Sequence, residues 1–366
     1  MDRAQEVSTK LEMVRSWLAQ AGFSGVVIGS QANFAWITAG GHNHVATGAE
    51  AGVGSVVVTA DHAAVVSPNI ETQRLIDEEL PAGCFESLEF PWHLPDEEAG
   101  IIDEVTGGGR VAGDLPNGKQ EPADGITELR RVLLEPEVER YRELAQDCAS
   151  IVESACRAAV PRESELDMAG RVGAMCFEKD ILPLVNLVAA DERINKYRHP
   201  IPTPNRVDHT MLVVLSARRH GLHASLTRTV CFGKPGEDQV ARHLASARVD
   251  TRLILESRPG ANLAEVFAAG VDQYAAEGFA GEWKLHHQGG LTGYSGREIK
   301  GSFDSNYVLQ DSQALAWNPS ITGAKSEDTV LTTNSGIEIL TATGHWPMIQ
   351  VEIGGSTLAR PDLLVR

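Results

Sequence analysis

The sequence lacks every segment that would place it in or across a membrane. No uncharged apolar run approaches the ~18 residues that a transmembrane helix needs. Its first residues, MDRAQEVSTKLEM, carry charges with no apolar stretch behind them, so no secretory signal peptide is expected. None of the five cysteines stands in a CxxC pair, which argues against a dithiol redox motif or a zinc knuckle. We therefore expect a cytoplasmic protein that makes no membrane contact.

A basic surface is lacking as well. The chain has 32 Lys and Arg residues against 50 Asp and Glu, a formal charge of −18. Nucleic acid is therefore excluded as the main partner, because phosphate binding needs a basic face. The 366 residues, 42% of them hydrophobic, are enough for two domains with well-filled cores.

The first part of the chain alternates helical and strand patterns. Ser8 can cap a helix that Gly22 ends, and Gly25–Gly29 (GVVIG) is typical of a buried strand. Further elements are predicted as a hairpin, a helix and a closing loop-rich stretch, in that order at 55–66, 71–79 and 91–125. We expect a smaller α/β domain over residues 1–133.

The second part follows a linker predicted at Leu134–Pro136. Its pattern is a helix pair, strands, a second helix pair and more strands. The helices are predicted at 137–159, 164–179 and twice within 239–278, and the strands at 184–189, 211–215, 229–232, 313–317 and 329–333. This order predicts an α+β domain over 134–366, with helices covering a sheet.

Three strings in this second part carry a family resemblance. They are MLVVLSARRHGLHASLTRTVCFG at 211–233, HHQGGLTGYSGRE at 286–298 and AWNPSITGAKSEDTVLTTNSGIEILT at 316–341. In this order and spacing they resemble the superfamily of creatinase, prolidase, aminopeptidase P and methionine aminopeptidase. The resemblance implies the pita-bread fold for the C-terminal domain and a creatinase-like N-terminal domain.

The metallopeptidases of that superfamily hold two divalent ions with two Asp, one His and two Glu. Four of these five positions, matched one by one, fall on residues that are not family ligands: Val214, Ser225, Gly290 and Asn318. Only the last Glu is retained, as Glu327. One carboxylate does not neutralise two ions about 3.5–4 Å apart or activate a bridging water. We therefore predict a metal-free site without a cofactor.

His199, in YRHP, matches the proton-transfer residue of creatinase, which also lacks metals. An imidazole whose pKa lies near 6.5 suits acid–base chemistry at neutral pH. The alternative is a packing histidine at the turn before Pro200.

Arg297 resembles the creatinase arginine that grips the substrate carboxylate; the alternative is an ion pair with Glu298. Glu327 could act as a base or bind a cationic group of the substrate, or it could pair with Arg228 or Lys325.

Further residues are expected around the same pocket. His286 matches a substrate-contacting histidine of the peptidases, and Trp317 could form part of the wall. Three more polar side chains complete the predicted substrate-binding set: His223, Ser225 and Asn318.

The resemblance implies a metal-independent hydrolase that cleaves a C–N bond in a small carboxylate-bearing molecule. A lyase with the same base is an alternative, as is a non-catalytic pseudoenzyme that binds a protein or peptide. A working Xaa-Pro metallopeptidase is disfavoured by the missing ligands. The resemblance also implies a homodimer.

Overall fold

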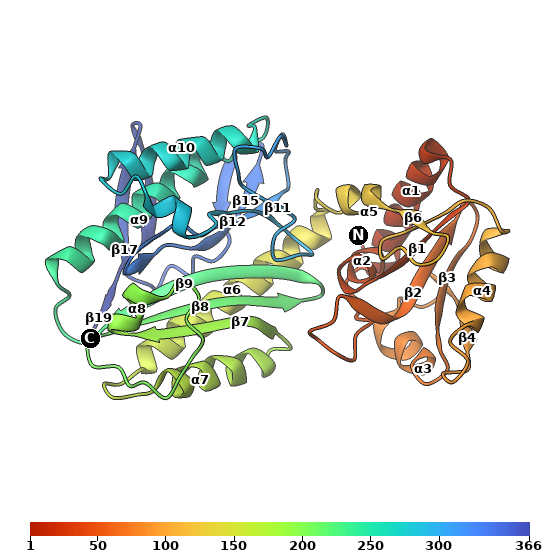
Figure 1. Cartoon of the computed structure of the whole chain (residues 1–366), viewed down its shortest axis with the longest axis horizontal. Helices are drawn as coiled ribbons and strands as arrows, with labels where there is room; N and C mark the ends of the chain where they lie inside the picture. The colour runs from red at the N-terminus through yellow and green to blue at the C-terminus, as the bar shows by residue number, and fades with distance from the viewer. The chain divides into compact units, whose positions relative to one another are not determined.

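The computed structural model describes all 366 residues of the chain. The chain divides into two compact units (Figure 1). One comprises Met1–Val138 with His220–Leu222, and the other comprises Glu139–Arg219 with His223–Arg366.

The N-terminal unit is built on a six-stranded mixed sheet with the order β4-β3-β2-β1-β5-β6. Its strands are β1 (Gly25–Ser30), β2 (Ala51–Thr59), β3 (Ala63–Pro68), β4 (Glu86–Phe90), β5 (Val111–Gly113) and β6 (Glu121–Pro122). Its helices are α1 (Arg3–Ala21), α2 (Gln31–Ile37), α3 (Thr72–Arg74) with η1 (Leu75–Glu79), α4 (Glu97–Thr106) and α5 (Asp124–Leu129).

Both faces of this sheet are covered. Val27, Val57 and Val66 pack against Ile102 of α4. Their neighbours along the strands, such as Val26, are also fully buried, so the strands read as continuous apolar runs rather than alternating ones. This explains why the GVVIG and SVVVT runs predicted strands correctly.

Two expectations for this unit are wrong. Asp2, not Ser8, caps the first helix: its side chain accepts from the Gln5 N–H at 2.8 Å, in a capping box. Gly22 ends that helix in the left-handed conformation as predicted, with φ 71°. The stretch 91–125 is not only loop, because it contains α4, β5 and β6.

The expected linker at Leu134–Pro136 is also wrong, because α6 (Glu135–Ala158) starts inside it. A carboxylate oxygen of Glu137 accepts from the Leu134 N–H at 2.7 Å. That bond satisfies one of the N–H groups left free at a helix start. Pro136 is compatible with the first turn, where it sacrifices no hydrogen bond.

The C-terminal unit contains two larger sheets. One has the order β19-β9-β8-β7, and the other has the order β11-β10-β12-β15-β16. Their strands are β7 (Leu182–Ala190), β8 (Thr210–Arg219), β9 (Leu222–Cys231), β10 (Gly289–Thr292), β11 (Ile299–Lys300), β12 (Ala314–Trp317), β15 (Asp328–Thr333), β16 (Gly336–Ile339) and β19 (Leu364–Val365). Two hairpins add β13 (Ser320–Ile321) with β14 (Ala324–Lys325), and β17 (Met348–Ile353) with β18 (Ser356–Pro361).

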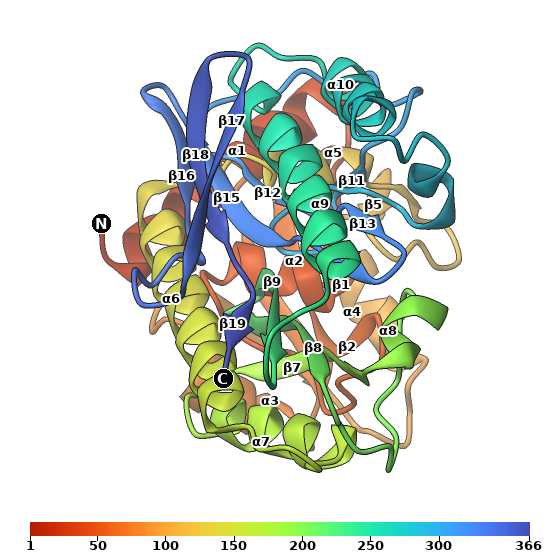
Figure 2. The same ribbon diagram turned by 90° about the vertical axis from the view of Figure 1, so that its left-hand side faces the viewer.

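Each sheet of this unit has its own helix pair. These are α6 and α7 (Glu165–Phe177) in the first half, and α9 (Glu237–Glu256) and α10 (Leu263–Ala276) in the second. Short helices α8 (Glu192–Lys196) and η2 (Glu282–Leu285) lie in the connections. Helix α7 packs on β7, and α9 packs on α10 and beside β17 (Figure 2). The predicted order of helix pairs and strands is thus confirmed, as is the α+β class.

A buried ion network ties the second half together. Arg360 of β18 is fully buried; it donates to Asp250 of α9 and, at 2.7 Å, to Asp328 of β15. Arg228 of β9 also donates to Asp328, at 3.0 Å. Because Asp328 follows Glu327 directly, the network fixes the backbone next to the one retained family carboxylate.

None of the helices combines the length and the apolar character needed to cross a membrane.

Candidate functional site

The segment that carries His199 is held from both sides. Arg198 donates to Ser320 Oγ at 3.1 Å and to Thr322 Oγ1 at 3.0 Å, and it pairs with Glu282. Arg193 donates to the Ile201 carbonyl at 3.0 Å. The histidine lies between these anchors, so its ring is positioned although it is exposed to solvent.

The segment that carries His286 is fixed by Tyr274 of α10. The tyrosine hydroxyl donates to Gln288 Oε1 at 2.6 Å and accepts from the Ser320 N–H at 2.8 Å. The Asn318 N–H donates to the Gln288 carbonyl at 2.9 Å. One buried phenol therefore holds the loops of the second and third strings together.

The imidazoles of His199 and His286 face each other, with their Nε2 atoms 3.0 Å apart. His286 is 9% exposed, and its Nδ1 atom is buried without a hydrogen-bond partner. A buried N–H without a partner costs more than a buried lone pair, so we assign the His286 proton to Nε2. His286 then donates to His199 Nε2, and His199 carries its own proton on Nδ1.

His287 completes a cluster of three imidazoles. Its ring stacks on that of His286, with centroids 4.5 Å apart, and one ring nitrogen from each of the three lies within 4.8 Å of the others. Burial lowers the pKa of His286 to about 2 and that of His287 to about 4, and the positive charge of Lys325 adds to both effects. Burial and Lys325 also lower the pKa of His199. The cluster is therefore neutral at pH 7.

Neutral imidazoles are possible ligands for a transition metal. The charges around this cluster oppose a cation, however. Lys325 acts on all three rings, Arg297 adds to its effect on His287, and Arg198 adds to its effect on His286. The negative charge of Glu327 acts in the opposite direction on His199 and His287, but its effect is smaller than that of Lys325. The cluster is better suited to proton transfer than to holding a divalent ion.

Glu327 lies between two cations. Its Oε2 atom is 2.9 Å from Lys325 Nζ and accepts from Thr227 Oγ1 at 2.8 Å, while its Oε1 atom is 3.6 Å from an Nη atom of Arg297. Glu327 is only 4% exposed and Lys325 only 7%. Burial opposes the charge of Glu327, but Lys325 and Arg297 outweigh it, so the pKa of this carboxyl is lowered.

The four residues that the sequence analysis matches to the other family ligands do not fit two metal ions. Val214 packs with Leu187 in an apolar cluster, and the Ser225 hydroxyl donates to Ser216 at 2.9 Å. Gly290 has φ +142°, and a Cβ there would lie 2.2 Å from the Ile299 carbonyl oxygen. The position is closed to any side chain, and to an imidazole above all.

Asn318 is the last of these four positions. It is 3% exposed, and its N–H donates to the Gln288 carbonyl at 2.9 Å. Its side-chain oxygen is buried without a hydrogen-bond partner. The set thus offers one carboxylate, one neutral amide and one hydroxyl, which is too little charge for a two-metal centre.

The structure brings several predicted site residues together and places others elsewhere. His199 and His286 are in direct contact, as are Glu327 and Arg297. His223 is buried, and a Cβ at Gly296 would lie 3.6 Å from its Nδ1 atom, which places it beside the loop of Arg297. Trp317 is fully buried in the core, and its indole donates to Ser257 Oγ at 2.8 Å. That is a core position rather than a place on a pocket wall.

The sequence indicates Lys325 only as a possible partner of Glu327. Its effect on the pKa values of the three histidines could not be predicted. The two residues are two apart around Ser326, in a run that pairs Lys325 with Ser320 across the β13–β14 hairpin. The signal available in the sequence is a lysine two residues before the one retained carboxylate.

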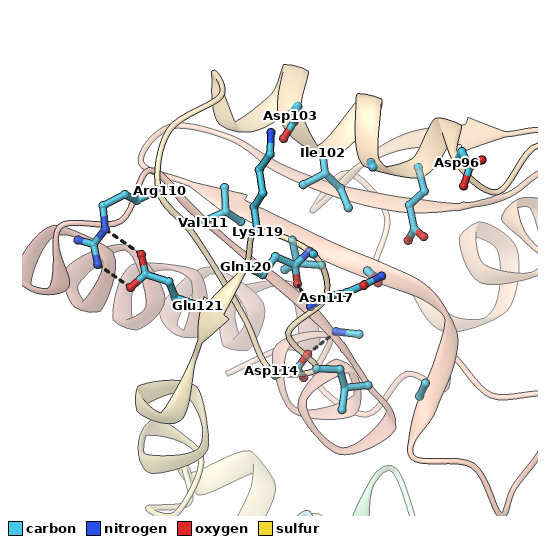
Figure 3. A pocket seen from close by; sticks show the side chains of 18 of the residues that line it. Asp96, Ile102, Asp103, Arg110, Val111, Asp114, Asn117, Lys119, Gln120 and Glu121 are labelled. Atoms are coloured by element: carbon cyan, nitrogen blue, oxygen red, sulfur yellow. Dashed lines mark hydrogen bonds and ion pairs between the residues drawn. The ribbon is translucent and has the colours of Figure 1, made fainter.

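A separate hollow of about 1090 Å³ lies in the N-terminal unit, between α4 and the 114–121 loop (Figure 3). The best-defined charges that line it already have partners. Asp114 accepts from the Gly29 N–H at 2.8 Å and from Ser30 Oγ at 2.6 Å, and Arg110 pairs with Glu121 at 2.8 Å. These groups stabilise the unit itself, so we do not assign the hollow as the functional site.

Comparison with known proteins agrees with the fold. The family model described as "Metallopeptidase family M24" matches residues 139–334. A Xaa-Pro dipeptidase from Pyrococcus furiosus is 23% identical over 308 residues, which cover 80% of this chain and 88% of the relative.

Solved structures give the same result. A prolidase from Thermococcus sibiricus superposes with a TM-score of 0.80 at 16% identity, covering 100% of both chains. The N-terminal domain of the FACT complex subunit SPT16 from chickpea superposes with a TM-score of 0.71 at 10% identity, covering 93% of this chain and 97% of that one. At these identities the likeness shows the fold alone.

Proposed function

The chain belongs to metallopeptidase family M24, and from that premise we propose that it is a metal-independent hydrolase of a small carboxylate-bearing substrate. The observation that carries the proposal is the pairing of Glu327 with Lys325 and Arg297 where the family fold holds metal ions. Two side-chain cations stand beside the one retained carboxylate. Lys325 and Arg297 thus supply positive charge around Glu327, where the ligands for two metal ions are missing.

In this proposal His199 transfers the proton. A water molecule replaces His286 as the partner of His199 Nε2, and His199 takes its proton as the oxygen adds to the carbon of the C–N bond. His199 then returns that proton to the departing nitrogen as the C–N bond breaks. A neutral imidazole at pH 7 is the form that such a base requires, and the lowered pKa of His199 supports it.

Arg297 binds the carboxylate of the substrate in this proposal. Its Nε atom is buried without a hydrogen-bond partner, so the guanidinium has a donor available for a substrate carboxylate. His286, His223, Ser225 and Asn318 remain proposed substrate contacts. The unpaired side-chain oxygen of Asn318 supports such a role, because it is an acceptor that a substrate N–H would satisfy.

The test begins with chain that has been treated with a strong chelator. It is incubated with N-acyl amino acids, ureido acids and dipeptides including Xaa-Pro, and the released amines are identified by mass spectrometry. We expect turnover that survives chelation and falls by roughly 10²–10⁴-fold in His199→Ala. Turnover that needs stoichiometric Mn, Co or Zn would instead indicate a working metallopeptidase.

Hydrolysis and elimination are distinguished by carrying out the reaction in ¹⁸O-labelled water. A hydrolase places the label in the product that bears the new C–O bond, whereas a lyase leaves both products unlabelled. Unlabelled products would replace our proposal with a lyase that uses the same base.

A second candidate is a non-catalytic binding protein. The observation in its favour is that both carboxylate oxygens of Glu327 already face cations, so this group is engaged rather than free to react. The similarity to the SPT16 domain, from a complex subunit, agrees with such a role at the level of fold. Absence of turnover across the panel, together with retention of a partner protein of basic charge, would favour this candidate.

We also propose a homodimer located in the cytoplasm. Sedimentation equilibrium at micromolar concentration tests the assembly, and a monomer throughout would overturn it.

A further inference from the structure

A groove of about 410 Å³ lies at the edge of the N-terminal sheet, between strand β4 and helix α4, which are neighbours in Figure 1. Its apolar lining consists of Leu88 of β4 and of Ile101 and Val105 of α4. These three side chains pack on the core cluster that includes Phe90 and Ile102, but each is only partly buried. A contiguous apolar lining that stays open to solvent is a candidate contact surface for another molecule.

Strand β4 is the outermost strand of the sheet on this side. It pairs with β3 alone, in parallel, from Ala64 with Glu86 to Pro68 with Phe90. The backbone N–H and C=O groups on its outer side therefore have no neighbouring strand. Such an edge can accept an extended peptide as one more strand, and alternate side chains of that peptide then point to the same face.

The rim of the groove is acidic. Glu86 and Glu89 of β4 and Glu104 of α4 line it, and all three are exposed to solvent. Glu86 pairs with His62 at 2.9 Å, whereas the carboxylates of Glu89 and Glu104 have no hydrogen-bond or ion-pair partner. Residues 75–109, which include β4 and α4, contain ten Asp and Glu residues and no Lys or Arg. No cation of this segment therefore offsets the charge of the rim.

We propose that this groove, together with the outer edge of β4, binds an extended basic peptide of a partner protein, in which one apolar side chain stands between lysines or arginines. The apolar side chain covers the partly buried lining, and the flanking cations pair with Glu89 and Glu104. Other occupants have the wrong charge, because the acidic rim repels nucleic acid, an anionic lipid surface and a second copy of this chain, whose formal charge is −18. The groove shares no residue with the site around His199, so the inference does not depend on the proposed hydrolase.

The experiment is a titration of fluorescently labelled synthetic peptides with the full-length chain at pH 7 and physiological ionic strength, followed by anisotropy. The probe is the peptide KRKLKRK, and its controls are KRKSKRK and EDELEDE. We expect KRKSKRK to bind roughly tenfold more weakly than the probe, because it lacks the apolar side chain that fills the groove. The acidic peptide should show no binding, because the rim repels it.

Glu89→Gln combined with Glu104→Gln removes both unpaired carboxylates of the rim. This double variant is expected to bind KRKLKRK roughly 5- to 20-fold more weakly. The matched control is Glu12→Gln combined with Glu128→Gln, which changes the net charge equally at exposed positions of α1 and α5 in the same unit. The control should bind the probe as the wild type does. Thermal melts show that each variant folds, and any turnover at the site around His199 should be unchanged in both.

Five results would overturn the proposal. No binding of KRKLKRK below about 1 mM would remove the site. An equal loss of affinity in the matched control would reduce the binding to attraction by net charge, and equal affinity for KRKSKRK would exclude the apolar lining. Binding of EDELEDE would contradict the role of the rim. A change in the mass of the peptide-free chain in Glu89→Gln with Glu104→Gln, measured by sedimentation equilibrium, would make this face a contact between two copies.

Discussion

The Nε2 atoms of His199 and His286 lie 3.0 Å apart, and Lys325 helps to lower the pKa of both rings. Two neutral imidazoles in contact titrate as a pair, because a proton taken up by one ring lowers the pKa of the other. Their titration is therefore the most direct readout of the charge at this centre.

Lys325→Met should raise the pKa of His199 and of His286, since it removes a positive charge that disfavours protonation of both. Proton NMR of the ring C–H signals between pH 4 and 8 measures this shift for His199, whereas His286, whose pKa burial lowers to about 2, should stay neutral across this range. Arg142→Met, which removes an exposed ion pair with Glu338, is the control and should leave the titration of His199 unchanged. A fall in the pKa of His199 would mean that Lys325 acts on the ring through structure rather than through charge.

Acid should destabilise the chain partly through His286. Its pKa is lowered by burial to about 2 in the folded state, so the unfolded state, near pKa 6.5, binds more protons as the pH falls below about 6.5. The contribution to the free energy of unfolding is full at pH 7 and falls by about 2 kcal/mol at pH 5. Urea titrations at the two pH values should show a smaller loss in His286→Gln than in the wild type. An equal loss in both would exclude His286 as the source.

Arg360→Met should cost about 3–5 kcal/mol of folding free energy, because it leaves Asp250 and Asp328 buried without their shared cation. Burial raises the pKa of Asp250 to about 6 even with Arg360 present, and loss of the arginine raises it further. The folded variant then takes up a proton that the unfolded chain does not, so its deficit should shrink as the pH falls from 7 to 5. Arg142→Met, at an exposed pair, should cost at most about 1 kcal/mol.

Gly290→Ala should destabilise the chain by about 1–3 kcal/mol, and Gly290→His by more. A Cβ at this position would approach the Ile299 carbonyl oxygen to 2.2 Å at a φ of +142°. Gly170→Ala is the control, because a Cβ there meets nothing within 4 Å and the helix around it favours alanine. Restoring the family histidine in this way should also leave the affinity for Zn²⁺ unchanged. A stable Gly290→His variant with tighter Zn²⁺ binding would contradict the geometry.

Much of the fold could be predicted because its signals are local. Apolar runs such as Gly25–Gly29 gave strands, and the helical pattern over 164–179 gave α7, for which the structure shows Ser164 as the N-cap in a capping box. Helix α4 was missed because its first residues follow a stretch rich in proline and acidic residues, which resembles a loop. Tertiary packing of Ile102 against the sheet decides its structure, and no local pattern reports that.

For the site, the sequence could predict several of the residues but not all of their contacts. Three strings in register located Glu327, Arg297 and His286, since each string carries its own pattern. Which cation would meet Glu327 depended on side-chain directions in the β13–β14 hairpin. Arg228, an equally good candidate from sequence, turns to Asp328 instead.

The closed backbone at Gly290 bears on how this chain could change. Carboxylates could return at Ser225 and Asn318 by exchange of one side chain for another. An imidazole at 290 would need β10 and β11 to separate first, because Gly290 is paired with Lys300 across that edge of the sheet. A variant that acquires all the two-metal ligands one by one would therefore include a step at which this sheet is weakened. Substitutions that each preserve stability do not reach that ligand set.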